Sequence, residues 1–160
     1  MPLFRPVRIA LFLATGAFGT VGCERPSAAS ARLALLTAPK WRLSDYVFCP
    51  EALAVPGAYN PGMAGQEPCF RDDITVFGMD GTYVEDEGPL KCRPDVPQAR
   101  RFKWRFLSQG RGLAQWYAPA GVRQEVERRY KILTLSPTTL VLEGWAPAYA
   151  CKVILTYTAL

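Results

Sequence analysis

Histidine is missing from this sequence of 160 residues, and its absence removes several kinds of chemistry. Without an imidazole, the chain cannot form Ser–His or Cys–His nucleophilic systems, His-ligated zinc or iron sites, or imidazole acid–base groups near neutral pH. The cysteines contain no CxxC pair and stand roughly twenty residues or more apart, which argues against a cysteine metal site as well. We therefore predict a non-enzymatic protein with no catalytic residue, no metal and no cofactor.

A long apolar run is missing too, because residues 9–18 (IALFLATGAF) are too few to cross a bilayer as a permanent helix. The basic residues 1–8 precede this short run, and that order is typical of a signal peptide. Gly22 directly before Cys23 resembles the bacterial lipobox, in which the cysteine becomes the first mature residue and is acylated. Thr20 departs from this pattern, since leucine is commonest there.

We predict a lipoprotein signal peptide over residues 1–22, with acyl chains such as palmitate on Cys23 anchoring the protein to a membrane of the cell envelope. Ordinary signal cleavage, which would leave Cys23 as a free thiol, is the alternative. Glu24 follows Cys23, so the aspartate that retains lipoproteins in the inner membrane of enteric bacteria is absent. The outer membrane is therefore the expected location.

Four cysteines remain once Cys23 is set aside, and in an exported protein they are expected to form disulfides. Four cysteines allow three connectivities. We favour Cys69–Cys92 at the outer ends of one hairpin, together with Cys49–Cys151 between the end of the first strand and the start of the last.

The sequence signal for this hairpin lies between Cys69 and Cys92. Residues 73–77 and 82–86 both have strand-like composition, and Asp80-Gly81 between them is a strong turn signal because glycine accepts positive φ without strain. Further strands are predicted from alternating or β-rich segments over residues 40–48, 100–108, 113–117, 125–135, 139–145 and 151–158.

About eight strands at short spacing, with no convincing helix among them, predict an all-β, antiparallel up-and-down barrel over residues 40–160. Residues 23–39 are interpreted as a tether, although Leu33, Leu35 and Leu36 also fit a short helix that covers one end of the domain. In residues 125–135 the apolar positions change parity at Leu133, so a bulge or bend is expected nearby.

Charge gives little indication of a partner. The net charge is +5, and removal of Arg5 and Arg8 with the leader leaves 17 basic and 14 acidic residues, or +3. Most basic residues alternate with aromatic ones along predicted strands, which is typical of the solvated face of a half-buried sheet. No nucleic-acid partner is predicted.

Short motifs follow one another along most of residues 40–160 in a specific order and spacing. They are Trp41-Arg42-Leu43, Cys69 with Asp72-Asp73, Asp80-Gly81-Thr82-Tyr83, Glu87-Gly88, Lys91-Cys92, Pro97-Gln98, Trp104, and the run from Tyr130 to Leu140. In this order and spacing the chain resembles the lipocalin-like lipoproteins of Bacteroidetes, which are small exported barrels. Cys49, Cys151 and the long loop after the first strand depart from the family pattern. The resemblance implies a lipocalin-type fold and carries no catalytic residues.

Inward-facing positions are expected to form either a ligand pocket or a filled core, and an eight-stranded barrel is at the size where both occur. A filled core with at most a shallow pocket is slightly favoured. Trp116 and Trp145 are expected at a rim or at the membrane surface. The candidate pocket or core residues are Trp41, Leu43, Tyr83, Phe102, Trp104, Phe106, Tyr130, Ile132 and Tyr157.

An acidic group accompanies the hairpin: Asp72, Asp73, Glu85, Asp86 and Glu87. These carboxylates are interpreted mainly as solvated strand ends, or as partners of Arg71, Lys91 and Arg93. Alternatively, pairing across the hairpin gathers these carboxylates at one rim, where they bind Ca²⁺ or a cationic partner, but the spacing matches no calcium loop. A two-carboxylate glycosidase is disfavoured because nothing positions a substrate cleft.

Two functions follow from these patterns. The first is a membrane-anchored binding module for a small apolar ligand. The second is a structural or protein-interaction envelope lipoprotein, for example an inhibitor, that uses the Pro- and Gly-rich loop from Cys49 to Pro68.

Overall fold

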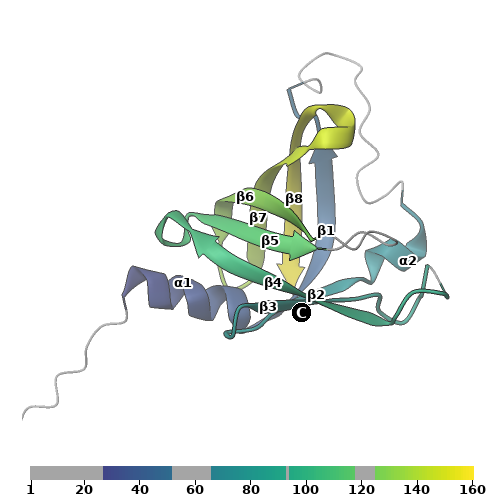
Figure 1. Cartoon of the computed structure of the whole chain (residues 1–160), viewed down its shortest axis with the longest axis horizontal. Helices are drawn as coiled ribbons and strands as arrows, with labels where there is room; N and C mark the ends of the chain where they lie inside the picture. The colour runs from purple at the N-terminus through teal and green to yellow at the C-terminus, as the bar shows by residue number, and fades with distance from the viewer. Residues whose placement is uncertain (1–26, 52–65, 93, 118–124) are drawn as a thin grey trace, which may run out of the picture.

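Eight antiparallel strands close into a barrel in which every strand pairs with its sequence neighbours and β8 returns to β1 (Figure 1). The structure is a computed structural model and describes residues 27–51, 66–92, 94–117 and 125–160. The all-β, up-and-down barrel predicted from the sequence is therefore confirmed. Its strands are β1 (Lys40–Phe48), β2 (Ile74–Phe77), β3 (Thr82–Asp86), β4 (Ala99–Leu107), β5 (Gly112–Tyr117), β6 (Val126–Leu135), β7 (Thr139–Ala146) and β8 (Cys151–Ala159).

Alternation along the strands gives the barrel its core. Tyr83 lies opposite Phe102 on the neighbouring strand, and Leu113 lies opposite Tyr130, so residues of one parity meet inside the barrel. Phe77 contacts Tyr83 and Trp104 through its ring, with centroids 5.9 and 5.5 Å apart. The buried core consists of Leu36, Trp41, Phe77, Tyr83, Trp104, Leu113, Tyr130, Ile132, Leu140 and Leu142.

Two β-bulges adjust this alternation. One lies in β6 between Ile132 and Thr134, next to the parity change that predicted it. The other lies in β1 between Leu43 and Asp45, where the sequence gave no comparable signal. After the β1 bulge, Tyr46 takes the inward position that strict alternation would have given to Asp45.

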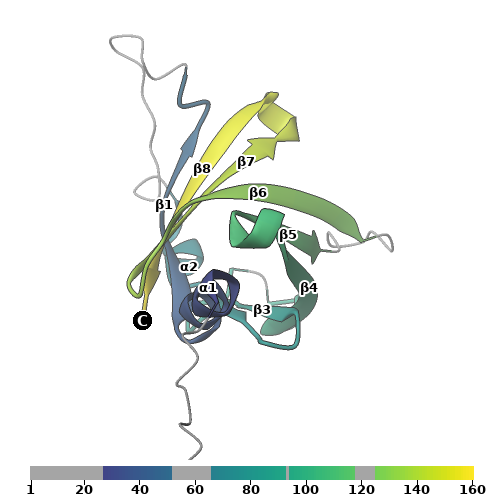
Figure 2. The same cartoon turned by 90° about the vertical axis from the view of Figure 1, so that its left-hand side faces the viewer.

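Helix α1 (Ala28–Thr37) closes one end of the barrel, where it contacts β2, β6 and the turn after β4. Leu36 is fully buried there, the Trp41 indole donates a hydrogen bond to the Leu36 carbonyl at 2.8 Å, and Arg32 Nε donates to the Gly110 carbonyl at 2.8 Å. In Figure 2, α1 is seen nearly end-on within the outline of the strands.

The tether predicted over residues 23–39 is therefore corrected in its second half, which is a helix packed on the barrel. The leucines that fitted a helix in the sequence include the one that is buried. Residues 23–26, with the predicted lipidation site Cys23 and the predicted signal peptide, lie outside the described residues. None of the helices in the described parts of the chain is long and apolar enough to cross a membrane.

The two ends of the barrel differ in their connections. At the closed end the strands are joined by short turns, including the predicted Asp80-Gly81 turn, where Gly81 has φ +81°. At the opposite end, which we call the mouth, longer connections join β1 to β2 and β3 to β4.

Short helices occur at both ends, although the sequence predicted none within the barrel. They are α2 (Pro68–Arg71) and the 3-10 turns η3 (Ser108–Gly110) and η4 (Pro147–Tyr149). Two of them, α2 and η4, begin with proline, which is favoured in the first turn of a helix.

Both disulfides of the preferred pairing are present, and both lie at the mouth. Cys49–Cys151 joins the end of β1 to the start of β8. Cys69–Cys92 joins α2 to the link after β3, so it connects segments that flank the hairpin rather than the hairpin strands themselves. Together they hold both ends of the connection between β1 and β2; residues 52–65 of that predicted loop lie outside the described residues.

Candidate functional site

A cavity of about 370 Å³ opens at the mouth of the barrel. Strands β1, β2, β3, β4 and β8 contribute to its wall, together with α2 and the link between β3 and β4. The volume is at the small end of the range for sites that bind small molecules. The apolar and aromatic part of the wall consists of Leu43, Tyr46, Phe70, Ile74, Val96 and Tyr157.

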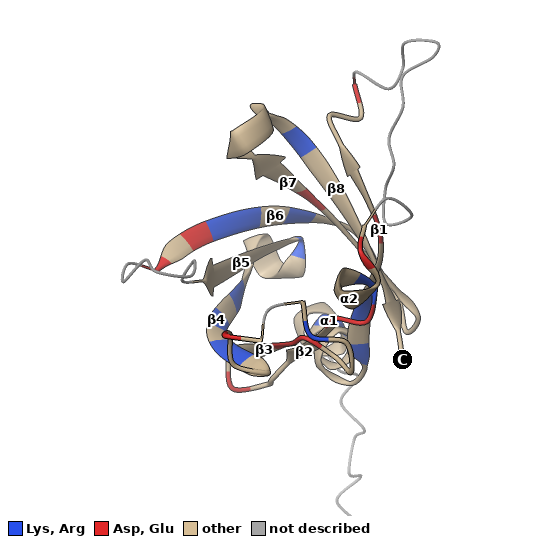
Figure 3. Cartoon of the chain, turned by 90° about the vertical axis from the view of Figure 1, so that its right-hand side faces the viewer, with Lys and Arg blue, Asp and Glu red and all other residues tan. Residues whose placement is uncertain are grey.

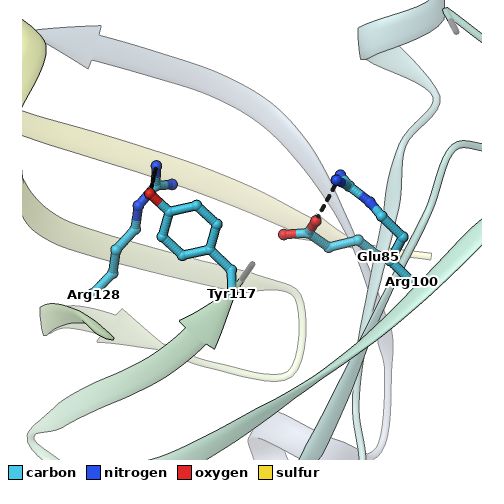
Figure 4. A network of polar contacts seen from close by, with 4 residues as sticks. All are labelled: Glu85, Arg100, Tyr117 and Arg128. Carbon is cyan, nitrogen blue, oxygen red and sulfur yellow. Dashed lines mark hydrogen bonds and ion pairs between the residues drawn. The ribbon is translucent and has the colours of Figure 1, made fainter. Parts of the chain in front are cut away.

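Charged side chains occupy inward positions on the same wall. Glu85 shares the parity of Tyr83, and Arg100 shares that of Phe102, so the register places this pair side by side inside the barrel. Arg100 Nη2 donates to Glu85 Oε2 at 3.1 Å (Figure 4). Burial raises the pKa of Glu85, and Arg100 and Arg128 partly oppose that rise.

A second polar pair faces the first from β5 and β6. Arg128 Nη2 donates to the Tyr117 hydroxyl at 2.9 Å, and the guanidinium carbon lies 3.9 Å from the centre of the same ring. Figure 4 shows the two pairs directed toward one another across the barrel interior. Figure 3 shows basic positions along β6, with an acidic one beside them, and acidic positions at β3.

Tyrosines line the boundary between core and cavity. Burial is the largest cause that raises the pKa of Tyr157, of Tyr130 and of Tyr83. These phenols therefore stay neutral at any physiological pH. Tyr157 lines the cavity itself.

The acidic group predicted as solvated strand ends has a different arrangement. Asp73, Glu85, Asp86 and Glu87 all line the cavity, whereas Asp72 Oδ2 accepts a hydrogen bond from the Leu90 backbone at 2.7 Å. Glu85 is directed inward beside Arg100 by the strand register, although its side chain stays 41% exposed to solvent at the mouth. In the sequence, the strand parity that Glu85 shares with Tyr83 indicates this inward direction.

Two of the basic partners suggested for this group donate to backbone carbonyls. Arg71 donates to the Gln66 carbonyl at 3.1 and 2.8 Å, and Lys91 Nζ donates to the carbonyls of Pro94 and Val96. Arg93 lies outside the described residues. Arg100 pairs with the group through Glu85. Most basic residues of the strands were expected on the solvated face, but Arg100 shares the inward parity of Phe102.

The candidate pocket or core residues divide into two sets along the barrel axis. Trp41, Tyr83, Trp104, Tyr130 and Ile132 are buried in the core near the closed end, and Phe102 and Phe106 are half-buried against it. Leu43 and Tyr157 line the cavity instead. The same inward face is thus packed at one end and hollow at the other.

The two remaining tryptophans point outward, as their parity indicates. Trp145 is 59% exposed near the mouth, and Trp116 lies beneath the Arg105 guanidinium, 5.3 Å from the ring centre. No group of three or more potential metal ligands occurs among the described residues.

Comparison with known proteins adds one structural similarity. No protein-family model matches the chain, and no curated protein matches it significantly. A solved complex of bovine odorant-binding protein with a selenium-containing odorant is similar over 80% of this chain and 72% of that one, with 18% identity and a TM-score of 0.41. The Bacteroidetes family is not identified by these comparisons. The barrel assignment rests on the strand pairings of this chain.

Proposed function

We propose that this protein is a non-enzymatic binding barrel that holds a small, mainly apolar molecule at its mouth. The observation that carries the proposal is the cavity of about 370 Å³ above a packed aromatic core. Its wall combines apolar side chains with a few convergent polar groups, which is the usual composition of a small-molecule site. The odorant bound by the bovine protein is consistent with this use of a β-barrel.

Ligand binding can be tested by filling the cavity. Thr75 lines it, whereas Val76 is the next residue on β2 and points to the opposite face of the sheet. We expect native mass spectrometry of the exported protein to show a co-purified ligand or uptake of hydrophobic probes. Thr75→Phe should abolish uptake and Val76→Phe should leave it unchanged. Absence of any uptake by the unmodified protein would contradict the proposal.

We also propose that the protein is a lipoprotein of the Bacteroidetes lipocalin-like type, anchored through acylated Cys23, with the outer membrane as its location. The lipobox-like sequence supports the anchor, and two disulfides are typical of exported proteins. Cys23→Ser should move the protein from the membrane fraction to the soluble fraction. A variant that remains membrane-bound would contradict acylation.

A second candidate function is capture of another envelope protein through the connection between β1 and β2. The two disulfides favour it, because they fix both ends of this connection to the barrel. Deletion of residues 54–65 should then abolish capture of a partner from envelope extracts, while uptake of small molecules should persist. Unchanged capture would exclude this function.

A further inference from the structure

The cavity has an unbalanced charge. Among the described residues, its lining contains the carboxylates of Asp73, Glu85, Asp86 and Glu87 and one cationic side chain, Arg100. Arg100 pairs with Glu85. For the other three carboxylates, the described part of the lining contributes no second cation.

Two of these three carboxylates contain buried oxygens with no hydrogen-bond partner. They are Asp73 Oδ1 and Glu87 Oε2. Asp86 differs, because its Oδ1 accepts hydrogen bonds from the Gly88 backbone at 3.0 Å and from Gln98 Nε2 at 2.8 Å. Burial of a charged oxygen without a donor is unfavourable, so Asp73 and Glu87 are the described carboxylates of the lining where a donor is missing. Asp72 Oδ1, outside the lining, also lacks a donor, and Arg100 Nε is a buried donor that lacks an acceptor.

The electrostatic surroundings of Asp73 agree with an excess of negative charge in the cavity. Burial first, and then the neighbouring carboxylates of Glu87, Asp72 and Glu85 in that order, raise the pKa of Asp73 to about 6. Arg100 is the one cationic group that opposes them. A positive charge in the cavity would relieve the same repulsion.

The remaining wall is suited to an organic body rather than to a bare ion. The aromatic side chains of Tyr46, Phe70 and Tyr157 line the cavity and offer faces that attract cations. The Tyr157 hydroxyl makes no hydrogen bond to any described residue, although protein surrounds this side chain closely enough to suppress its ionisation. Within the described parts of the chain no cluster could hold a metal ion.

We propose that the cavity binds a small organic cation, namely a protonated amine on an aromatic or short aliphatic body. The ammonium group lies toward Asp73 and Glu87, where its N–H groups supply the missing donors, and the body lies against the aromatic wall. This inference rests on the proposed binding function and specifies its ligand class.

Three probes with the same phenyl skeleton test the inference: 2-phenylethylamine, 2-phenylethanol and 3-phenylpropionate, titrated calorimetrically into the exported protein at pH 7.5. The amine should bind about tenfold or more tightly than the neutral alcohol, as expected for a charge-assisted hydrogen bond, and the acid should bind most weakly. Equal binding of amine and alcohol would overturn the inference and leave the binding function intact. Failure of all three probes and of hydrophobic dyes would overturn both.

Carboxylate variants locate the site. Asp73→Asn and Glu87→Gln should each lower the affinity for the amine about tenfold and leave that for the alcohol unchanged. Glu127→Gln is the matched control, because Glu127 pairs with Arg129 outside the cavity and loses the same charge. An equal loss of affinity for the amine in Glu127→Gln would show that only the net charge of the protein matters. That result would overturn the assignment of the site to Asp73 and Glu87.

The dependence on pH provides an independent readout. Affinity for the amine should fall between pH 7.5 and pH 5, because Asp73 gains a proton in this range while the amine stays charged. Affinity for the alcohol should stay constant. In Asp73→Asn the fall should largely disappear, and an unchanged fall would assign the titrating group to another residue and overturn the role of Asp73.

Discussion

Charged residues at inward strand positions give the mouth its chemical character. Glu85, Arg100 and Arg128 each continue the parity of an aromatic core residue on the same strand, so the strands that pack the core also carry charge into the hollow half of the barrel. Their inward direction could be predicted from parity alone. Which carboxylates remain unpaired could not, because that depends on how the link after β3 folds back over Asp72.

A close approach fixes the position of this link. Gly88 has φ +64°, and a side-chain carbon there would lie 2.5 Å from the Asp72 carbonyl oxygen. Glycine is therefore required for both conformation and space. Asp73 and Glu87 lie directly beyond the last β2–β3 pair, Ile74 and Asp86, so the hairpin register places them on the same side of the cavity. The hairpin in the sequence indicates this gathering of carboxylates.

Asp73→Asn should make the protein more stable at neutral pH. The folded state holds the Asp73 proton more tightly than the unfolded chain does, since the pKa rises from 3.8 to about 6. This group therefore contributes fully to the free energy of unfolding below pH 4. The contribution is lost as the pH rises through 6. At pH 7.5 the variant should gain about 1 kcal/mol after allowance for solvent screening.

Urea denaturation at pH 4 and pH 7.5 checks this sign. The difference between variant and unmodified protein should shrink toward pH 4, because Asp73 stays protonated in the folded protein there and the unfolded chain also begins to take up the proton. A variant that is less stable at pH 7.5 would show that the ionised carboxylate has a partner in the folded protein.

Gly144→Ala should destabilise the barrel through one contact. A side-chain carbon at Gly144 would lie 2.7 Å from two atoms of the buried Tyr130 ring. Overpacking of this kind costs about 1–3 kcal/mol, measurable as a lower urea midpoint. In a Tyr130→Leu background the cost should fall, and an equal cost in both backgrounds would place the strain elsewhere.

At the scale of elements, the strands were predictable, whereas α1 appeared in the sequence only as an alternative to a tether. Residues 40–48 and 82–86 form strands with the expected bounds, because alternation and an Asp-Gly turn are local signals. Helix α1 depends on burial of Leu36 against the barrel, and a short Ala-rich segment without that contact resembles a linker. Tertiary packing therefore decides this element.

Leu36→Ala should cost about 2–5 kcal/mol, because a fully buried leucine leaves a cavity between α1 and the core. Leu35→Ala is the matched control in the same helix, since Leu35 is only half-buried and outside the core cluster, and its cost should be about 0.5 kcal/mol or less. Thermal or urea unfolding of both variants gives the comparison. Equal costs would mean that α1 does not close the barrel in solution.

At the scale of the molecule, covalent links are confined to one end. The closed end is held by α1 and short turns, whereas the mouth contains both disulfides. This division places rigid noncovalent packing beneath the cavity and cross-links around its opening.

Removal of each disulfide should have a different effect. Cys49 and Cys151 are 102 residues apart, whereas Cys69 and Cys92 are 23 apart. The chain-entropy model gives losses of about 5 and about 3 kcal/mol respectively when each pair is changed to serine. Urea unfolding of the two double variants checks the order, and a reversed order would indicate residual structure in the unfolded chain around the first pair.

The position of α1 also determines which end of the barrel lies nearest to the N-terminal part of the chain. The described chain begins at Ser27, at the closed end, so anything attached through the N-terminus holds the molecule by its base. The mouth then points away from the point of attachment. A protein tethered in this way would collect its ligand from the aqueous compartment rather than from the bilayer to which it is fixed.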